Sequence, residues 1–288
     1  MSLFSNYSGH RLVLLAPQEF VGIPDFGRHT VDHNRHADLL SAMQRFRGAV
    51  YLSEGAIQSS DLTADGRHSQ ATDEESWHVL SVDHNDAVKG CSRYREYHES
   101  VRFDYLGVSR SELAHSEAWS GRLMKAVQQE ISVARERGIS LVEVGGWAVA
   151  EEARLGADAL RLALSTFALA RMLGGCIGLT TATVRHCSST ILRKLGGRTL
   201  NVDGQEIPRY FDTAYDCDME ILRFDSAEPN PRFIEILDRL TADVASGEVV
   251  TAGEPTVSTQ PWKAAAETNS RPLASVDLIP DFAVALAV

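Results

Sequence analysis

Residues 141–184 place an apolar helix between two strand-like runs, and this order restricts the fold more than any other feature. Residues 141–149 read LVEVGGWAV and residues 176–184 read CIGLTTATV, both rich in strand-forming side chains. Residues 157–173 form a helix that is apolar on nearly every side, so it has to be buried. A connecting helix allows the two strands to lie parallel. The segment therefore predicts an α/β domain.

The neighbouring segments add a hairpin on each side and further helices. Alternating side chains on both sides of the turn at residues 84–86 predict a first hairpin over residues 77–97. Residues 117–137 predict an amphipathic helix that Gly138 ends, and residues 188–195 predict one that Gly196 and Gly197 end. A second hairpin is expected to close the domain with DMEILRFD at residues 218–225.

The N-terminal quarter is more mixed. Residues 37–48 predict a helix with Gly48 as its stop, followed by a short strand at residues 49–54. Residues 58–76 read as a polar, turn-rich loop.

The composition changes near residue 227, which indicates three parts. We expect a domain over residues 1–226, with residues 1–75 as its N-terminal helical and loop part. Residues 227–246 are expected to hold a surface helix. From residue 247 onward Thr, Ser, Pro and Ala dominate, so residues 247–288 are predicted to be a linker and a C-terminal tail.

Charge and targeting signals narrow the class of function. The net charge of −11 over 288 residues argues against general binding to nucleic acid or an anionic membrane. No apolar run is long enough to span a membrane, and the N-terminus lacks a secretory signal, so a cytoplasmic protein is expected. His29, His33 and His36 would share a face if their stretch is helical, but the stretch lacks the glutamate of an HExxH zinc site, and we expect no metal.

The junction between residues 145 and 159 suggests binding of a phosphorylated ligand. Two glycines interrupt the strand, and Arg154 comes just before a helix whose first turn has small side chains. A helix N-terminus offers unpaired N–H donors and a partial positive charge, so it binds phosphate. The alternative is an ordinary strand-to-helix turn with small residues for close packing.

The order of strand, helix, strand, helix and hairpin resembles the GNAT acyltransferase fold. The junction Arg154-Leu155-Gly156-Ala157-Asp158-Ala159 is similar to that family's phosphate-binding Arg/Gln-x-x-Gly-x-Gly/Ala. The segment Gly90-Cys-Ser-Arg93 and the run from Glu143 to Val149 further resemble autoinducer synthases and long-chain N-acyl amino acid synthases, with Gly146 where arginine is usual. The resemblance implies an α+β sandwich: a mixed, mostly antiparallel central sheet with splayed parallel strands and helices on both faces.

The resemblance also implies a reaction, in which an acyl group moves from a pantetheine thioester to an amine. The donor would be a cosubstrate, either acyl-CoA or an acylated carrier protein, with no permanently bound cofactor. The residues implied in donor binding are Trp147, Ala148, Val149, Arg154, Leu155, Gly156, Ala157 and Ala159. Because Ala157 replaces a glycine and Asp158 adds a negative charge, a carrier protein with one phosphate fits better than the pyrophosphate of CoA.

Catalytic roles follow from the same resemblance. The backbone N–H of Val149 would stabilise the oxyanion, and Glu143 would act as the general base, directly or through a water. Alternatively, Glu143 faces solvent or pairs with an arginine. Leu192 stands where many family members have a tyrosine, and a thiolate leaving group can depart without such an acid.

Further residues are candidates for binding substrates. Arg93 would hold an acceptor carboxylate or order the acidic loop, with Arg45 and Asp73 in the same network, although each can be an ordinary surface charge. Trp147 and the glycines suit an acyl tunnel, or else a bulge with a core aromatic. A carrier protein would dock on the positive charge around the last helix, unless this charge is only a solvated helix face; the residues are Arg185, Arg193, Lys194 and Arg198.

Three functions remain open from the sequence. We expect transfer of a medium or long fatty acyl chain to an amino acid or a similar small acceptor. An acetyl-CoA-dependent N-acetyltransferase and a catalytically inactive binding module with this fold are the alternatives.

Overall fold

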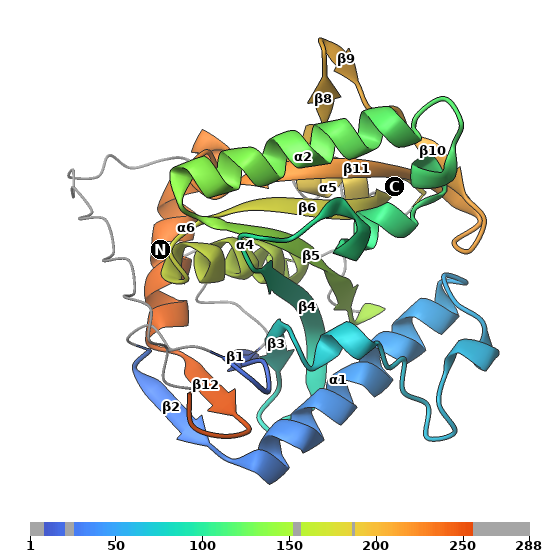
Figure 1. The fold of residues 1–288 in the computed structure, drawn as a ribbon. Coiled ribbons are helices and arrows are strands. Elements are labelled where there is room, and N and C mark those ends of the chain that lie inside the picture. Colours follow the sequence, from blue (N-terminus) through green and yellow to red (C-terminus); the bar gives the residue numbers. More distant parts are fainter. Residues whose placement is uncertain (1–8, 21–25, 152–156, 186–187, 256–288) are drawn as a thin grey trace.

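The fold is built on one mixed ten-stranded sheet (Figure 1). The computed structural model describes residues 9–20, 26–151, 157–185 and 188–255. Along the sheet the strands run β10-β11-β6-β5-β4-β3-β1-β12-β2, with β7 also paired to β11. The strands of this sheet are β1 (Arg11–Leu15), β2 (Arg28–Val31), β3 (Trp77–Val82), β4 (Val88–Tyr97), β5 (Ser140–Val149), β6 (Cys176–Thr183), β7 (Arg198–Thr199), β10 (Tyr210–Asp212), β11 (Cys217–Asp225) and β12 (Glu248–Thr251). A separate small hairpin consists of β8 (Asn201–Val202) and β9 (Gln205–Glu206).

Most neighbouring strands are antiparallel, as expected. The parallel pairs are β5 with β6, β1 with β12, and β12 with β2. The hairpin of β3 and β4 and the hairpin of β10 and β11 both lie where the alternating sequence predicts them. The predicted mixed α/β sheet is confirmed.

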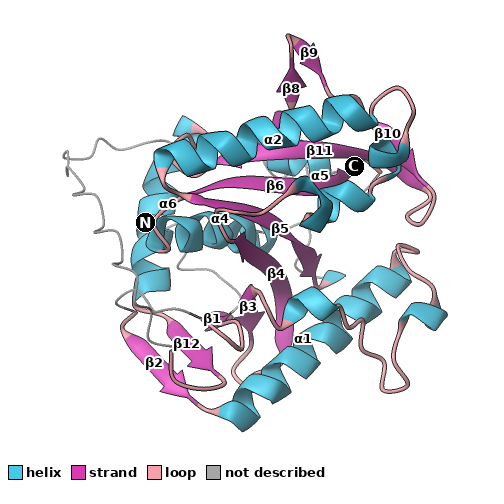
Figure 2. Cartoon of the chain, viewed as in Figure 1, coloured by secondary structure: helices cyan, strands magenta, loops and turns pink. Residues whose placement is uncertain are grey.

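Helices cover both faces of the sheet (Figure 2). They are α1 (His33–Ser53), α2 (Ser120–Arg137), α4 (Ala157–Met172), α5 (Ser188–Lys194) and α6 (Ile234–Ala245). Alternate residues of one strand enter different core clusters: Leu14 packs with α4 and α6, whereas Val13 and Leu15 pack with α1. The buried helix α4 lies between the sheet and α6, which explains why it is apolar on nearly every side.

Local signals set the ends of the two long helices. The Asp32 side chain caps α1 by accepting a hydrogen bond of 3.0 Å from the Arg35 N–H. Gly138 ends α2 in the left-handed conformation at φ 63°.

Helix α1 is longer than predicted, and the expected strand at residues 49–54 is wrong. Gly48 lies inside the helix and not at its end. A Cβ at Gly48 would lie 2.9 Å from Leu62 Cδ2 and 3.0 Å from the Gly66 carbonyl oxygen. This glycine is therefore required for close approach of the 62–68 loop and does not act as a helix stop.

Gly48→Ala is expected to destabilise the protein although alanine is the better helix former. The helix-propensity gain is about 1 kcal/mol and overpacking against the loop backbone costs about 1–3 kcal/mol, so we expect a net loss of up to about 2 kcal/mol. Urea unfolding measures it. Gly121→Ala in α2 is the matched control, because a Cβ there meets nothing within 4 Å and should raise stability slightly. A Gly48→Ala protein more stable than wild type would contradict this packing.

The segment after residue 247 does not begin as a linker. Residues 248–251 form β12, which lies between β1 and β2 in the sheet. Glu248 on this strand is buried and forms ion pairs with Arg11 at 2.8 Å and Arg35 at 2.5 Å. The linker prediction is wrong for these residues because a strand of only four residues in a Thr- and Gly-rich stretch gives little periodic signal.

Helix α6 was expected as a surface helix, and one of its faces is buried. Leu237, Leu240 and Val244 are buried, and the helix packs on α4. None of the helices among the described residues combines the length and apolar character that a membrane span requires.

Candidate active site

The two parallel strands β5 and β6 separate in the middle of the sheet. They are paired from Ser140 with Cys176 up to Glu143 with Leu179. Beyond the last pair β5 continues to Val149 and β6 to Thr183. On its other side β5 stays paired with β4, with a bulge between Cys91 and Arg93. The strands open well before Val149, so one edge of each is available to a ligand.

A pocket of about 760 Å³ occupies this opening. Its walls include residues 143–149 of β5 and residues 179–183 of β6. Ala159 in the first turn of α4, Leu192 of α5 and Tyr51 of α1 also line it. We call this space the main pocket. Residues from both faces of the sheet line the main pocket, as a site that binds two substrates requires.

A second, apolar pocket of about 60 Å³ joins the main pocket. Val144, Gly145, Trp147, Thr180 and Leu192 line both. The indole nitrogen of Trp147 is buried and has no hydrogen-bond partner among the described residues. A buried donor without an acceptor is costly, and at this junction it is suited to an oxygen atom of a ligand.

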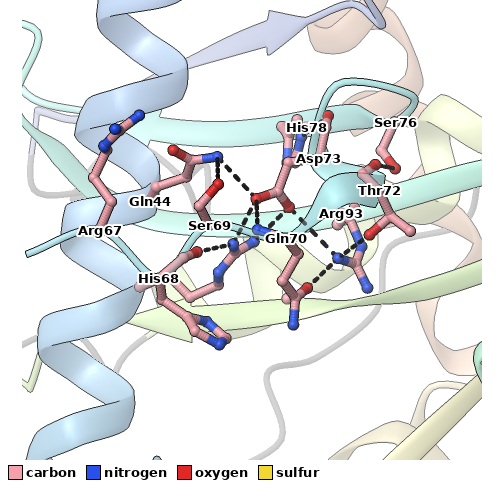
Figure 3. A network of polar contacts seen from close by, with 12 residues as sticks. Gln44, Arg67, His68, Ser69, Gln70, Thr72, Asp73, Ser76, His78 and Arg93 are labelled. Atoms are coloured by element: carbon pink, nitrogen blue, oxygen red, sulfur yellow. Dashed lines mark hydrogen bonds and ion pairs between the residues drawn. The ribbon is translucent and has the colours of Figure 1, made fainter. Parts of the chain in front are cut away.

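A fully buried ion pair lies beside the main pocket. The side chains of Arg47 and Asp73 are both 0% exposed, and two hydrogen bonds of 3.0 and 2.7 Å join them. Arg47 also donates to the His68 carbonyl oxygen, and Asp73 accepts from the Gln44 side chain and the Gln70 N–H, each at 3.0 Å. Figure 3 shows the Asp73 carboxylate in the middle of this network. Burial alone would raise the pKa of Asp73, but Arg47 outweighs it and holds that pKa well below its usual range.

Arg93 connects this ion pair to the main pocket. Its Nη1 donates to Gln70 and, at 2.8 Å, to Thr72, and it lies 3.5 Å from the Asp73 carboxylate (Figure 3). Arg93 thus contacts the loop at residues 70–73, and its two predicted roles, to order this loop or to hold an acceptor carboxylate, stay predictions. Arg93 also lines the main pocket, and its Nε is a buried donor with no partner among the described residues.

Gly146 passes close to both arginines. It has φ 60°, and a Cβ there would lie 3.2 Å from the Arg93 Cβ and 3.3 Å from Arg47 Nη1. A side chain at Gly146 would therefore be strained at this φ and would crowd Arg47 and Arg93.

Arg45 is not part of the network, which corrects the sequence prediction. Its guanidinium pairs with Asp65 at 3.2 Å, and both side chains are 50% exposed. The arginine that reaches Asp73 is Arg47, half a helical turn away. Asp73 and Arg93 are brought together as predicted.

Three buried histidines lie near this region and stay neutral. Burial lowers the pKa of His36 and His68, and it lowers the pKa of His78 to about 4. His78 Nε2 lies 2.9 Å from the Asp73 carbonyl oxygen, and its Nδ1 has no partner among the described residues. A second proton on His78 would find no acceptor.

We expect the protein to lose stability as the pH falls from 7 to 5. In the unfolded chain the histidines bind protons with the ordinary pKa near 6.5, whereas in the folded chain the buried histidines bind them only at lower pH. Protonation therefore stabilises the unfolded state more than the folded state, and the free energy of unfolding decreases as the pH falls. His78 alone contributes about 2 kcal/mol of this loss between pH 7 and pH 5, because its folded pKa is about 4. His78→Gln should flatten the slope of unfolding free energy against pH, and His84→Gln in the exposed β3–β4 turn should not. Equal slopes in wild type and His78→Gln would show that His78 is not responsible.

Glu143 points its carboxylate at a turn that borders the main pocket. Oε2 accepts from the Gly107 N–H at 2.7 Å and from the Tyr97 hydroxyl, and Oε1 accepts from the Val108 N–H at 2.8 Å. The side chain is half-buried and lines the main pocket. It does not face open solvent, and no arginine among the described residues pairs with it. Its predicted role as a base stays a prediction, now with a second role in holding the turn at residues 107–110.

The predicted donor-binding residues fall into two groups. Trp147, Ala148, Val149 and Ala159 line the main pocket, and Ala157 begins α4. Arg154, Leu155 and Gly156 lie outside the described residues. The Asp158 carboxylate, which the sequence placed near a phosphate, lies 3.8 Å from His10 Nδ1.

The four basic residues around α5 do not form one free patch. Arg193 pairs with buried Glu220 at 2.5 Å, and Arg198 pairs with Glu228 at 3.1 Å. Arg185 is exposed at the main pocket and donates to the Tyr215 carbonyl oxygen. Lys194 lies at the end of α5. The predicted cluster of positive charge is therefore largely neutralised by its own carboxylates.

The histidine stretch does not form one helical face, which corrects another prediction. His29 lies on β2 and contacts the Thr251 hydroxyl, while His33 begins α1. No group of three or more His, Cys, Asp or Glu side chains able to hold a metal ion occurs among the described residues. Burial raises the pKa of the Cys91 thiol to about 11 and that of Cys176 to about 12, so neither is a ready nucleophile.

Known structures share this arrangement of strands and helices. The CoA-dependent acyl-homoserine lactone synthase BjaI with SAM and isopentyl-CoA aligns over 86% of this chain and 96% of its own, with a TM-score of 0.50 and 14% identity. The same synthase with MTA gives a TM-score of 0.51 at 15% identity over the same shares. This chain has the acyl-homoserine lactone synthase fold. The predicted likeness to autoinducer synthases is confirmed at the level of the fold.

Other comparisons add little to this result. FeeM, an N-acyl amino acid synthase from uncultured soil microbes, aligns over 76% of this chain and 92% of its own, with a TM-score of 0.45 and 14% identity. No protein-family model matches the sequence, and no curated protein matches it. Three residues of the site were not predicted from the sequence: Arg47, Tyr97 and Tyr94, which lines the apolar pocket.

Proposed function

We propose that the protein is an N-acyltransferase that moves an acyl group from a pantetheine thioester to the amine of a small acceptor. The observation that carries the proposal is the separation of β5 and β6 beyond Glu143 and Leu179, with the main pocket in the opening. A thin pantetheine arm fits between two separated strands, where it can pair with free strand edges. The synthase fold supports the same reaction class.

The donor would lie along the α4 side of the opening. Its phosphate end would rest near the N-terminus of α4, where Ala157 and Ala159 leave room and the helix dipole favours an anion. The thioester would lie beside residues 145–149, and the acyl chain would enter the apolar pocket. The small volume of that pocket favours a short chain over the medium or long chain that the sequence suggested.

The acceptor would approach from the side of Arg93 and Glu143. The unpartnered Nε of Arg93 suits an acceptor carboxylate, so an amino acid or a derivative of one fits this half of the pocket. The BjaI structure contains SAM, which also carries an amine and a carboxylate, and we include it among the acceptors to be tested.

The reaction then proceeds by direct attack. The neutral amine nitrogen forms a bond to the thioester carbonyl carbon, and the oxyanion that develops is stabilised by N–H donors, for which we propose the Val149 backbone. The C–S bond breaks as the tetrahedral intermediate collapses, and the amine proton passes to Glu143 directly or through a water. The pantetheine thiolate leaves and takes up a proton from solvent.

The form of the donor needs a direct comparison. A carrier protein would meet the exposed Arg185 at the mouth of the main pocket, since Arg193 and Arg198 are already paired. Acyl-CoA and acylated carrier protein with the same acyl group, compared by kcat/KM, separate the two sources. Arg185→Glu should weaken use of the carrier protein more than use of acyl-CoA, because the charge would repel an acidic partner.

The experiment that tests the function is product formation. The protein is mixed with acyl-CoA or acylated carrier protein of four to twelve carbons and with a panel of amino acids and SAM, and N-acyl products are sought by mass spectrometry. Acylated products support the proposal. Transfer from acetyl-CoA alone would favour the N-acetyltransferase alternative, and ligand binding without any product would favour the inactive binding module.

A further inference from the structure

The apolar pocket runs along the α4 face of β6, away from the main pocket. Thr180 and Trp147 line both spaces and mark the junction, whereas Cys176 and Ser226 line only the apolar pocket and mark its inner end. Phe167 of α4 and Phe224 of β11 meet edge to face on its wall, with ring centroids 5.6 Å apart. If the proposed function holds, this is where the acyl chain lies.

Gly178 in the middle of β6 affects the volume of the apolar pocket, because it has no side chain. A Cβ at Gly178 would lie in ordinary contact, 3.6 Å from the Phe224 Cβ and 3.9 Å from Val144 Cγ2. A larger side chain on the same backbone would extend into the pocket. The pocket volume of about 60 Å³ is several times the roughly 10–15 Å³ that one enclosed water molecule needs, so the pocket has room for a short stretch of acyl chain.

One hydroxyl in this apolar wall has no good acceptor. Tyr94 is 0% exposed, and its hydroxyl has no hydrogen-bond partner among the described residues that meets normal geometry. It interacts with the buried thiol of Cys176, which is a weak acceptor. Burial also raises the Tyr94 pKa, so the hydroxyl keeps its proton and remains a donor.

Apart from the Trp147 indole N–H at the junction with the main pocket, the other polar side chains of this wall have hydrogen-bond partners. The hydroxyls of Ser92 and Thr166 lie 2.6 Å apart, and Thr166 also donates to the Leu162 carbonyl oxygen at 3.1 Å. The Ser226 hydroxyl accepts from the Cys176 N–H at 2.8 Å. The unmatched donor at the inner end is thus a specific feature of the Tyr94 position and not a general property of the wall.

We infer that Tyr94 and Gly178 select a short acyl chain that carries a neutral oxygen, such as a ketone or hydroxyl, toward its far end. Gly178 leaves space for the chain, and the Tyr94 hydroxyl donates to the oxygen when it reaches the inner end. A carboxylate is disfavoured there, because the surrounding wall is apolar and offers no positive charge among the described lining residues. The inference rests on the proposed function.

The test compares matched donors. Hexanoyl-CoA and octanoyl-CoA are each compared with the chain that bears a ketone on the penultimate carbon, and with the chain that bears it on carbon 3. We expect wild type to prefer the penultimate ketone over the plain chain by about fivefold in kcat/KM for the length that fits. In Tyr94→Phe this ratio should fall to about one, while the melting temperature of the free protein should change little, because only the weak interaction with the Cys176 thiol is lost.

Ser165→Ala is the matched control for Tyr94→Phe. Ser165 is also fully buried, and its hydroxyl has no hydrogen-bond partner in the described part of the chain, but it lies on α4 outside the lining of the apolar pocket. The preference of the Ser165→Ala variant for the penultimate ketone over the plain chain should equal that of wild type. An equal preference in wild type, Tyr94→Phe and Ser165→Ala overturns the role of Tyr94, and so does a stronger preference for the ketone on carbon 3.

Gly178→Val tests the length of the chain separately. It should reduce transfer of the six- and eight-carbon chains at least tenfold relative to acetyl, because the isopropyl group fills the pocket. An unchanged length profile would place the chain elsewhere. If wild type transfers no donor to any acceptor, the proposed function fails. The shift in melting temperature on adding hexanoyl-CoA and 5-oxohexanoyl-CoA to wild type and Tyr94→Phe then still decides the selectivity of the pocket.

Discussion

Glu143→Gln lowers kcat/KM for N-acyl product formation by about 100-fold or more, if Glu143 is the general base. Glutamine has nearly the same shape, and its one oxygen can still accept from the N–H of either Gly107 or Val108, while its NH2 group faces the other N–H donor. The variant therefore loses part of the hydrogen bonding to the turn as well, which Tyr97→Phe helps to separate from the loss of the base. The catalytic property that is lost is the ability to take the amine proton. Purified wild type and variant are compared at saturating donor over a range of acceptor concentrations.

A purely structural role of Glu143 gives a different result. If the carboxylate only holds the turn, Glu143→Gln raises KM with little change in kcat, and the pH profile of kcat keeps its acidic limb. Tyr97→Phe is the control, since it removes one hydrogen bond to Oε2 and leaves the carboxylate in place. Full activity of Glu143→Gln with an unaltered pH profile excludes this residue as the base.

Arg47→Met lowers the free energy of unfolding by about 3–5 kcal/mol, the cost of leaving a buried charge without its partner. Asp73 is 0% exposed, and of its partners in the described part of the chain it would keep the Gln44 amide, the Gln70 N–H and the longer contact to Arg93. The total free energy of unfolding of a typical domain is only about 5–15 kcal/mol, so this loss is a large share of the stability. Urea denaturation followed by tryptophan fluorescence measures it.

Arg45→Met provides a matched control on the same helix. Its pair with Asp65 is half-exposed on both sides, so solvent screens it and the urea midpoint should not move measurably. The double variant Arg47→Met with Asp73→Asn should lose less than the sum of the two single variants, because no uncompensated charge is then buried. Additive losses would mean that the two side chains do not act as a pair.

Much of the fold follows from periodicity, because long elements carry a strong pattern. The apolar helix α4 and the alternation in the β3–β4 hairpin both have many residues that agree with one period. The predicted end of the first helix at Gly48 is wrong, because a glycine that ends a helix and a glycine that allows close packing cannot be distinguished in the sequence. The short strands β1, β2 and β12 were missed, because their pairing depends on contacts distant in the chain.

The site was predicted in part, for a similar reason. Arg45 was predicted to belong to the network with Asp73, although the helical spacing in the sequence already favours Arg47. Counting from His36 by helical steps passes through Leu40, Met43, Arg47 and Val50, all buried, whereas Arg45 falls on the opposite side. The donors that hold Glu143 come from a turn at residues 107–108 with no motif, and they could not have been foreseen.

The position of β12 has a consequence for the order in which the chain acquires its structure. β2 is made early in synthesis, yet its strand partner is β12, about 220 residues later along the chain. During translation the edge strand therefore has to remain exposed, or be shielded by a chaperone, until the ribosome has released residue 251. The N-terminal margin of this sheet is thus completed last, although it is synthesised first.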